Sequence, residues 1–127
     1  MIDTIMPCFV INEELLQLTK NAIESLGKVN VIIVDNGSPI GGGYLRSVAD
    51  VYIRNKENLG YAKAVNQGFK LTRTEMIAVA NNDIRVSPNW QEVAVEVLSE
   101  KNVYSCHFRM CDYDIPFEEG DAIWLTG

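Results

Sequence analysis

Several features that define other protein classes are missing from this sequence of 127 residues. Cysteine is scarce: Cys8, Cys106 and Cys111 form an odd set at no regular spacing, which does not indicate a disulfide framework. Cys106, His107 and Cys111 also lack the fourth ligand and the paired Cys-x-x-Cys of a zinc site. We therefore interpret the three cysteines as ordinary residues of a reduced protein.

Long hydrophobic runs and an excess of positive charge are missing as well. No apolar run approaches the roughly 20 residues that span a bilayer, and the N-terminus has no basic segment followed by an apolar one. We therefore expect a cytoplasmic protein with no transmembrane segment. The net charge of -6 argues against general binding to nucleic acid or anionic membranes, because both require clustered Lys and Arg.

The composition that remains is that of a globular protein, with 47% hydrophobic and 22% charged residues. The length fits a single domain over residues 1–127. Its most distinctive stretch is Met76–Val86, in which five apolar residues are followed by Asn81, Asn82 and Asp83. This pattern predicts a buried strand with Asn82 and Asp83 at its carboxyl end.

Strand and helix patterns alternate along the rest of the chain. Asn12 is typical of a helix N-cap before an apolar face that Gly27 ends, and Ser87-Pro88 predicts the start of a helix with Trp90 on its apolar face. Residues 2–10 are predicted to be a first strand that runs into a loop around 7–9. The other predicted strands are 29–34, 51–53, 103–110 and 122–125, and the other predicted helices are 44–49 and 61–72. Such alternation indicates an α/β fold with a mostly parallel central sheet flanked by helices.

Three of the predicted strands end in short segments, of which the second and third are polar. They are the segments 7–9, 35–38 and 81–83. Because ligands of open α/β sheets bind outside the carboxyl ends of the strands, we expect these segments to form a ligand site at one edge. A carboxylate such as Asp83 can ligate Mg²⁺ or Mn²⁺ there.

Four blocks of sequence carry a resemblance to a known family. They are Pro7-x-Phe9, Val31–Ser38, Asn58–Gly68 and Ala80–Asp83, in that order. Together they resemble the family 2 inverting glycosyltransferases of the A-type fold, over roughly the first ninety residues. The resemblance implies a Rossmann-like nucleotide-diphospho-sugar transferase fold and a donor that carries UDP, GDP or dTDP.

The resemblance also implies roles for individual residues. Pro7 and Phe9 would line the base and ribose, and Asp35 would accept a hydrogen bond from the base. Other residues near the nucleotide-sugar would be Asn58, Gly60, Lys63, Asn66 and Asn82. Asp83 matches the last carboxylate of the family's Asp-x-Asp motif and would bind the divalent cation, Mn²⁺ or Mg²⁺.

The chemistry that the resemblance implies is displacement at the anomeric carbon by an acceptor hydroxyl, with a metal that stabilises the departing diphosphate. The family's general base follows a Trp-containing strand that ends in Gly, and Trp124 would mark that strand on the acceptor side. Glu118, Glu119 and Asp121 precede Trp124, so we interpret them as a solvated loop. We expect the catalytic base beyond Gly127 and a domain that is incomplete at the C-terminus.

Two alternatives remain beside transfer. A nucleotide-sugar binding module without transfer activity fits the single carboxylate in Asn81-Asn82-Asp83. A nucleotidyltransferase acting on sugar phosphates shares the sheet architecture, but its early Gly-rich, basic phosphate-binding signature is absent after the first strand. The sequence identifies neither the donor sugar nor the acceptor, and it leaves open whether the chain forms homo-oligomers.

Overall fold

Four strands form one parallel sheet in residues 1–106, the part of the chain that the computed structural model describes. The strands follow one another across the sheet in the order β3-β2-β1-β4. Their bounds are β1 Asp3–Cys8, β2 Asn30–Asp35, β3 Val51–Arg54 and β4 Ile77–Val79. Every pairing between them is parallel, as the alternation of strand and helix predicts.

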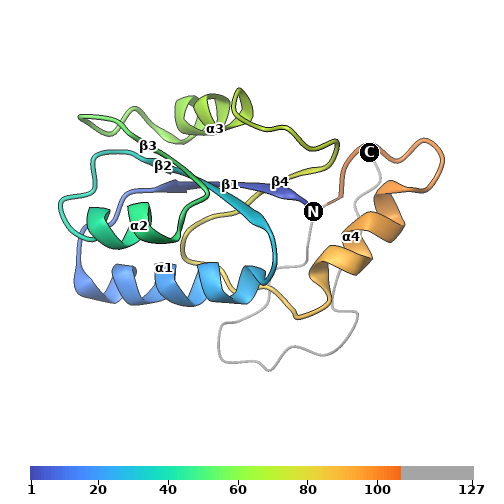
Figure 1. Ribbon diagram of the computed structural model, residues 1–127, viewed down its shortest axis with the longest axis horizontal. Coiled ribbons are helices and arrows are strands. Elements are labelled where there is room, and N and C mark those ends of the chain that lie inside the picture. The colour runs from blue at the N-terminus through green and yellow to red at the C-terminus, as the bar shows by residue number, and fades with distance from the viewer. Residues whose placement is uncertain (107–127) are drawn as a thin grey trace. The chain divides into compact units, whose positions relative to one another are not determined.

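The centre of the sheet is made by β1 and β2, whose side chains are buried almost throughout. Ile5, Ile33 and Val34 have no exposed surface at all. Helices cover both faces, with α3 above the sheet and α1 and α2 below it in the view of Figure 1. Their bounds are α1 Glu13–Leu26, α2 Gly42–Val48 and α3 Tyr61–Phe69. This arrangement explains why β2 is apolar along nearly its whole length.

The predicted first helix is confirmed at both ends. The Asn12 side chain accepts a hydrogen bond of 2.8 Å from the Leu15 N–H, and Glu13 and Glu14 occupy the first turn. Gly27 ends the helix with a positive φ of 69°. Here the cap, the apolar spacing and the stop signal all agree, so the sequence alone defines the element.

The last strand differs from its prediction. A strand does form, but it is limited to Ile77–Val79, and in the described residues it pairs only with β1. Val79 is 49% exposed, so the prediction of a buried strand is wrong. The apolar run predicts that a strand forms here. It does not predict the position of the strand in the sheet, and the burial of the strand depends on that position.

The chain divides into two compact units, Met1–Ile84 and Arg85–Gly127. The second contains α4, Trp90–Leu98, whose predicted apolar face is buried at Trp90, Ala94 and Val97. The helix start predicted at Ser87-Pro88, with Ser87 as N-cap, is wrong, because Asn89 is the N-cap. The backbone carbonyl of Ser87 accepts the Trp90 N–H at 3.1 Å in the turn before the helix. The prediction of one domain over residues 1–127 stays a prediction.

The remaining C-terminal predictions concern mostly residues after 106. Residues 103–106 form no strand, so that part of the predicted strand at 103–110 is wrong. The rest of that strand, the acidic segment and the strand at 122–125 lie outside the described residues. Within residues 1–106, no helix has the length and apolar content needed to cross a membrane.

Candidate functional site

The carboxyl ends of β1, β2 and β3 lie level with one another at one edge of the sheet. Cys8 pairs with Asp35, and Asp35 pairs with Arg54, so each of these three residues ends its strand at the same height. β4 stops lower, because Val79 pairs with Ile5. A parallel sheet therefore brings a thiol, a carboxylate and a guanidinium to one edge.

Asp35 is buried completely and is held by three protein donors. One carboxylate oxygen accepts the Ser38 N–H at 2.8 Å. The other accepts the Tyr52 hydroxyl at 2.6 Å and a guanidinium nitrogen of Arg54 at 2.7 Å. Burial raises the pKa of Asp35, but the hydrogen bonds from Tyr52 and Ser38 and the charge of Arg54 outweigh it and lower that pKa below 3.8. The carboxyl is therefore ionised at neutral pH.

Sequence reasoning missed Tyr52 and Arg54 as members of this site. The signal that could have found them is the alternation of side chains along a strand, which places residues 52 and 54 on the same face. In the structure both side chains reach Asp35 of the neighbouring strand.

Burial and the Asp35 charge raise the pKa of Cys8 to about 12, so its thiol stays neutral and is no nucleophile at neutral pH.

A second polar cluster, of side-chain amides, ties the loop after β3 to the edge. Asn36 accepts from the Asn55 amide at 2.9 Å and donates to the Gly60 carbonyl at 3.3 Å. Asn55 and Gln67 exchange two further hydrogen bonds of 2.7 and 2.9 Å. Sequence reasoning placed Asn36 at the ligand edge but did not identify Asn55 and Gln67 as its partners. Together the three amides hold the start of α3 beside the end of β2.

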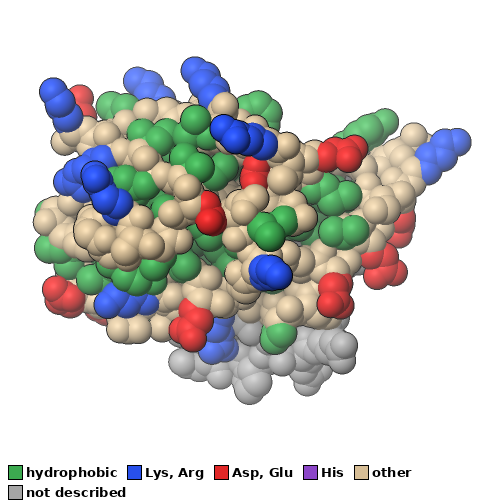
Figure 2. All heavy atoms as spheres, viewed as in Figure 1, with side chains coloured by type: hydrophobic (Ala, Val, Ile, Leu, Met, Phe, Trp, Pro, Cys, Tyr) green, Lys and Arg blue, Asp and Glu red, His purple; other side chains and the backbone are tan. Residues whose placement is uncertain are grey.

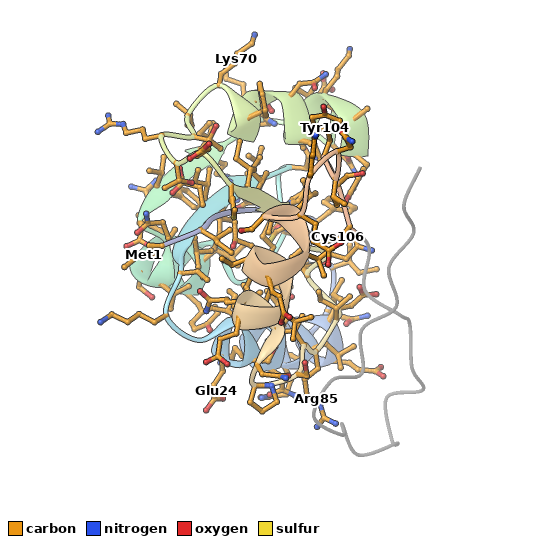
Figure 3. All side chains as sticks on the ribbon, turned by 90° about the vertical axis from the view of Figure 1, so that its right-hand side faces the viewer. Met1, Glu24, Lys70, Arg85, Tyr104 and Cys106 are labelled. Atoms are coloured by element: carbon orange, nitrogen blue, oxygen red, sulfur yellow. The ribbon has the colours of Figure 1, made fainter. Side chains whose placement is uncertain are left out.

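Four residues predicted near the nucleotide-sugar lie at this start of α3. The side-chain oxygen of Asn58 accepts a hydrogen bond of 2.9 Å from the Gly60 N–H. Gly60 has a positive φ of 90°, and a Cβ placed on it would meet no atom within 4 Å. Lys63 and Asn66 are exposed on the helix that follows. Residues 54–73 hold five Lys and Arg and one acidic residue, although the chain as a whole is acidic. Lys and Arg side chains gather over α3 in Figure 2, and Figure 3 shows Lys70 projecting from its end.

The predicted residues of β1 differ in exposure. Pro7 is buried within the strand, whereas Phe9, just after it, is 40% exposed at the edge. Val10 follows, and its N–H donates to the Ser38 hydroxyl at 2.8 Å. The segment after β1 is thus joined to the segment after β2, next to Asp35.

Asn82 and Asp83 form a turn after β4. The Asn82 amide donates to the Thr19 hydroxyl of α1 at 3.1 Å, while Asp83 is exposed. β1 separates β4 from β2, and neighbouring strands are about 4.8 Å apart. Asp35 therefore ends β2 and Asp83 follows β4, which are the strands on either side of β1. Trp124 lies outside the described residues.

The metal-binding prediction depends on Asp83. Residues 1–106 contain no group of three or more His, Cys, Asp or Glu side chains that could hold a metal ion. An exposed single carboxylate nevertheless fits Mg²⁺ or Mn²⁺ that arrives with a diphosphate, because such ions take one or two carboxylates together with phosphate oxygens and water. An exposed carboxylate after β4 is therefore compatible with a cation that the ligand brings.

Comparison with known proteins agrees with this architecture. The family model described as Glycosyl transferase family 2 matches residues 3–124. The match covers nearly the whole chain and includes all four strands and the edge at which they end. No curated protein matches the chain.

Proposed function

Because the chain belongs to glycosyltransferase family 2, we propose that it binds a nucleotide-diphospho-sugar at the carboxyl-end edge of its sheet and transfers the sugar to an acceptor hydroxyl. The observation that carries the proposal is the family match over residues 3–124 on a parallel sheet whose first three strands end in Cys8, Asp35 and Arg54. The A-type fold of this family is an α/β fold of the kind seen here. The nucleotide would lie along the ends of β1 and β2, beside Phe9 and the segment after Asp35.

The diphosphate would lie toward the start of α3. Gly60 leaves open space there, and Lys63 supplies a positive charge. The first backbone N–H groups of the helix add a partial positive charge. This placement offsets the repulsion between an anionic ligand and a protein of net charge -6.

The reaction would invert the configuration of the sugar. The acceptor oxygen bonds to the anomeric carbon from the side opposite the diphosphate, the bond from that carbon to the diphosphate oxygen breaks, and the acceptor proton passes to a base. A divalent cation held by Asp83 would stabilise the charge on the departing diphosphate. No residue within 1–106 is assigned as the base.

Asp83 provides the first test of this proposal. We expect nucleotide sugars to raise the melting temperature of the chain in Mn²⁺, and Asp83→Asn to remove the Mn²⁺-dependent part of that rise. Glu24→Gln is the matched control, because Glu24 is an exposed carboxylate in the last turn of α1 and projects on the side of the sheet opposite Lys70 (Figure 3). Calorimetry with and without Mn²⁺ gives the affinities.

Equal Mn²⁺-dependent affinity in the wild type and in Asp83→Asn would contradict the metal role. The absence of any stabilising nucleotide sugar would contradict the function itself. Release of free nucleotide from a bound donor separates the two candidate activities, because a binding module stabilises without releasing it. The single carboxylate of Asn81-Asn82-Asp83 is the observation that keeps this second candidate.

A further inference from the structure

The side chain that faces solvent at the end of β2 and β3 belongs to Arg54 rather than to Asp35. The Arg54 side chain is 43% exposed, whereas that of Asp35 has no exposure. The two residues are partners in the strand register and are joined at 2.7 Å. A ligand that arrives at this corner of the sheet therefore meets the guanidinium first.

Three neighbours shield the Asp35 carboxylate from such a ligand. A carboxylate offers about four acceptor positions, and Ser38, Tyr52 and Arg54 use three of them. Gly42, the first residue of α2, packs beside the oxygen that Tyr52 and Arg54 share: a Cβ on it would lie 3.7 Å from that oxygen and 3.2 Å from an Arg54 nitrogen. The Asp35 side chain as a whole has no exposed surface. A donor on a ligand would have to displace one of these groups to reach Asp35.

Arg54 is oriented by two acceptors. One terminal nitrogen donates to Asp35 at 2.7 Å and the other to the Ser38 carbonyl at 3.0 Å. An arginine has five N–H groups in a planar fork, so others remain for a ligand. Its charge is balanced by Asp35, which makes it a directional hydrogen-bond donor more than a source of net positive charge. Exposed Lys63, at the start of α3, fits the diphosphate better.

We propose that Arg54, held in place by Asp35 and Ser38, reads the base of the nucleotide by donating a hydrogen bond to a carbonyl oxygen of that base. The inference rests on the proposed function and gives the site a preference among nucleotide bases. Uracil, thymine and guanine present such a carbonyl. Adenine presents an amino group instead, and because this group and the guanidinium are both hydrogen-bond donors, they cannot bond to each other. A site built to hydrogen-bond one group rejects the ligand that lacks it. Asp35 is then a positioning residue.

The test uses UDP, dTDP, GDP and ADP as probes, each with Mn²⁺, and measures their dissociation constants by calorimetry. We expect the wild type to bind at least one of the three carbonyl-bearing nucleotides about tenfold or more tighter than ADP. Arg54→Met should reduce that ratio to about threefold or less. Tyr52→Phe is the matched control, because it removes another donor to Asp35 but leaves Arg54; it should retain the wild-type ratio.

Two results with a wild type that binds nucleotide would overturn the inference alone. One is a ratio in Arg54→Met equal to that of the wild type; the other is an equal loss of affinity for all four probes. A wild type that binds none of the four would overturn the proposed function, and this inference with it. If Arg54→Met fails to fold because it leaves a buried carboxylate unpaired, the double variant Asp35→Asn with Arg54→Met removes both charges and should show the same loss of preference.

Discussion

Asp3 and Asp35 are both buried carboxylates, at opposite ends of neighbouring strands, and protein donors hold each of them. Asp3 starts β1 and is 4% exposed. It accepts the Arg73 N–H at 2.6 Å, the Thr74 N–H at 3.1 Å and the Asn30 amide at 2.9 Å. Asp3 thus anchors the loop between α3 and β4 far from the ligand edge, which gives it a structural role.

Replacing Asp3 tests this structural role by its pH dependence. Burial raises the pKa of Asp3, but the hydrogen bonds from Arg73, Asn30 and Thr74 outweigh it and lower that pKa below 3.8. We expect Asp3→Asn to lower the free energy of unfolding at pH 7 by about 1.5 to 3 kcal/mol, the usual worth of a hydrogen bond to a charged group. Urea denaturation measures the change, with the exposed Glu75→Gln of the same loop as control.

The difference between the wild type and Asp3→Asn should shrink in acid. A carboxyl whose pKa is lower in the folded state contributes its full stability above the unfolded pKa of about 3.9 and loses it as the pH falls through the folded value. Unfolding measured from pH 7 to pH 3 follows this change. A difference that stays constant down to pH 3, or none at pH 7, would refute the anchoring role of the ionised carboxylate.

The sequence predicted the carboxylate at the end of β2 but not the residues that bind it. The polar stop after a β-branched run identifies Asp35, because it is a local signal. Tyr52 and Arg54 become visible only through the pairing of β2 with β3, which local pattern does not specify. That Arg54 is exposed while Asp35 is buried likewise follows from packing, which the local pattern does not specify.

Helix α3 packs unusually close to the sheet, and one glycine makes this possible. Gly68 lies on the inner face of α3, and a Cβ there would stand 2.5 Å from the Ile5 Cγ2 of β1. A Cβ cannot fit at that distance unless the Ile5 side chain, the helix or the strand moves. The glycine therefore sets the depth at which α3 packs, and with it the place of Gly60 and Lys63 at the other end.

Gly68→Ala should therefore destabilise the fold even though alanine favours helix. We expect overpacking to cost about 1 to 3 kcal/mol, partly offset by a gain of about 1 kcal/mol in helix propensity, which leaves a net loss of up to about 2 kcal/mol. Gly43→Ala is the matched control: Gly43 is also in a helix, and a Cβ there meets no atom within 4 Å. It should be neutral or stabilising. Thermal unfolding of both variants gives the comparison, and equal melting temperatures would disprove the close-packing account.

The elements themselves were predicted well where several local signals coincide. The cap at Asn12, the apolar face and Gly27 together define α1. At α4 the apolar spacing from Trp90 predicted the helix correctly, but Ser87-Pro88 misplaced its start, because the N-cap is Asn89. β4 was found as a strand, yet its exposure depends on its place at the end of the strand order.

The first compact unit, Met1–Ile84, is organised by β2, because this strand pairs on both sides and has helices on both faces. Val34 is the last residue but one of this strand, has no exposed surface, and pairs with Pro7 and Ile53. Asp35, the next residue, turns its side chain to donors supplied by β3. One residue of register thus separates a position that tolerates a carboxylate from one that does not.

Val34→Asp should unfold the chain for this reason. An unpaired buried carboxylate costs several kcal/mol, which is comparable with the 5 to 15 kcal/mol that stabilise an ordinary domain. Val51→Asp is the matched control, since Val51 is also a strand valine but is 36% exposed in the edge strand β3. Circular dichroism and urea unfolding should show loss of the cooperative transition only in Val34→Asp. A cooperative transition at the wild-type midpoint in that variant would mean that β2 is not the centre of the fold, and the edge that we assign to the nucleotide would lose its support.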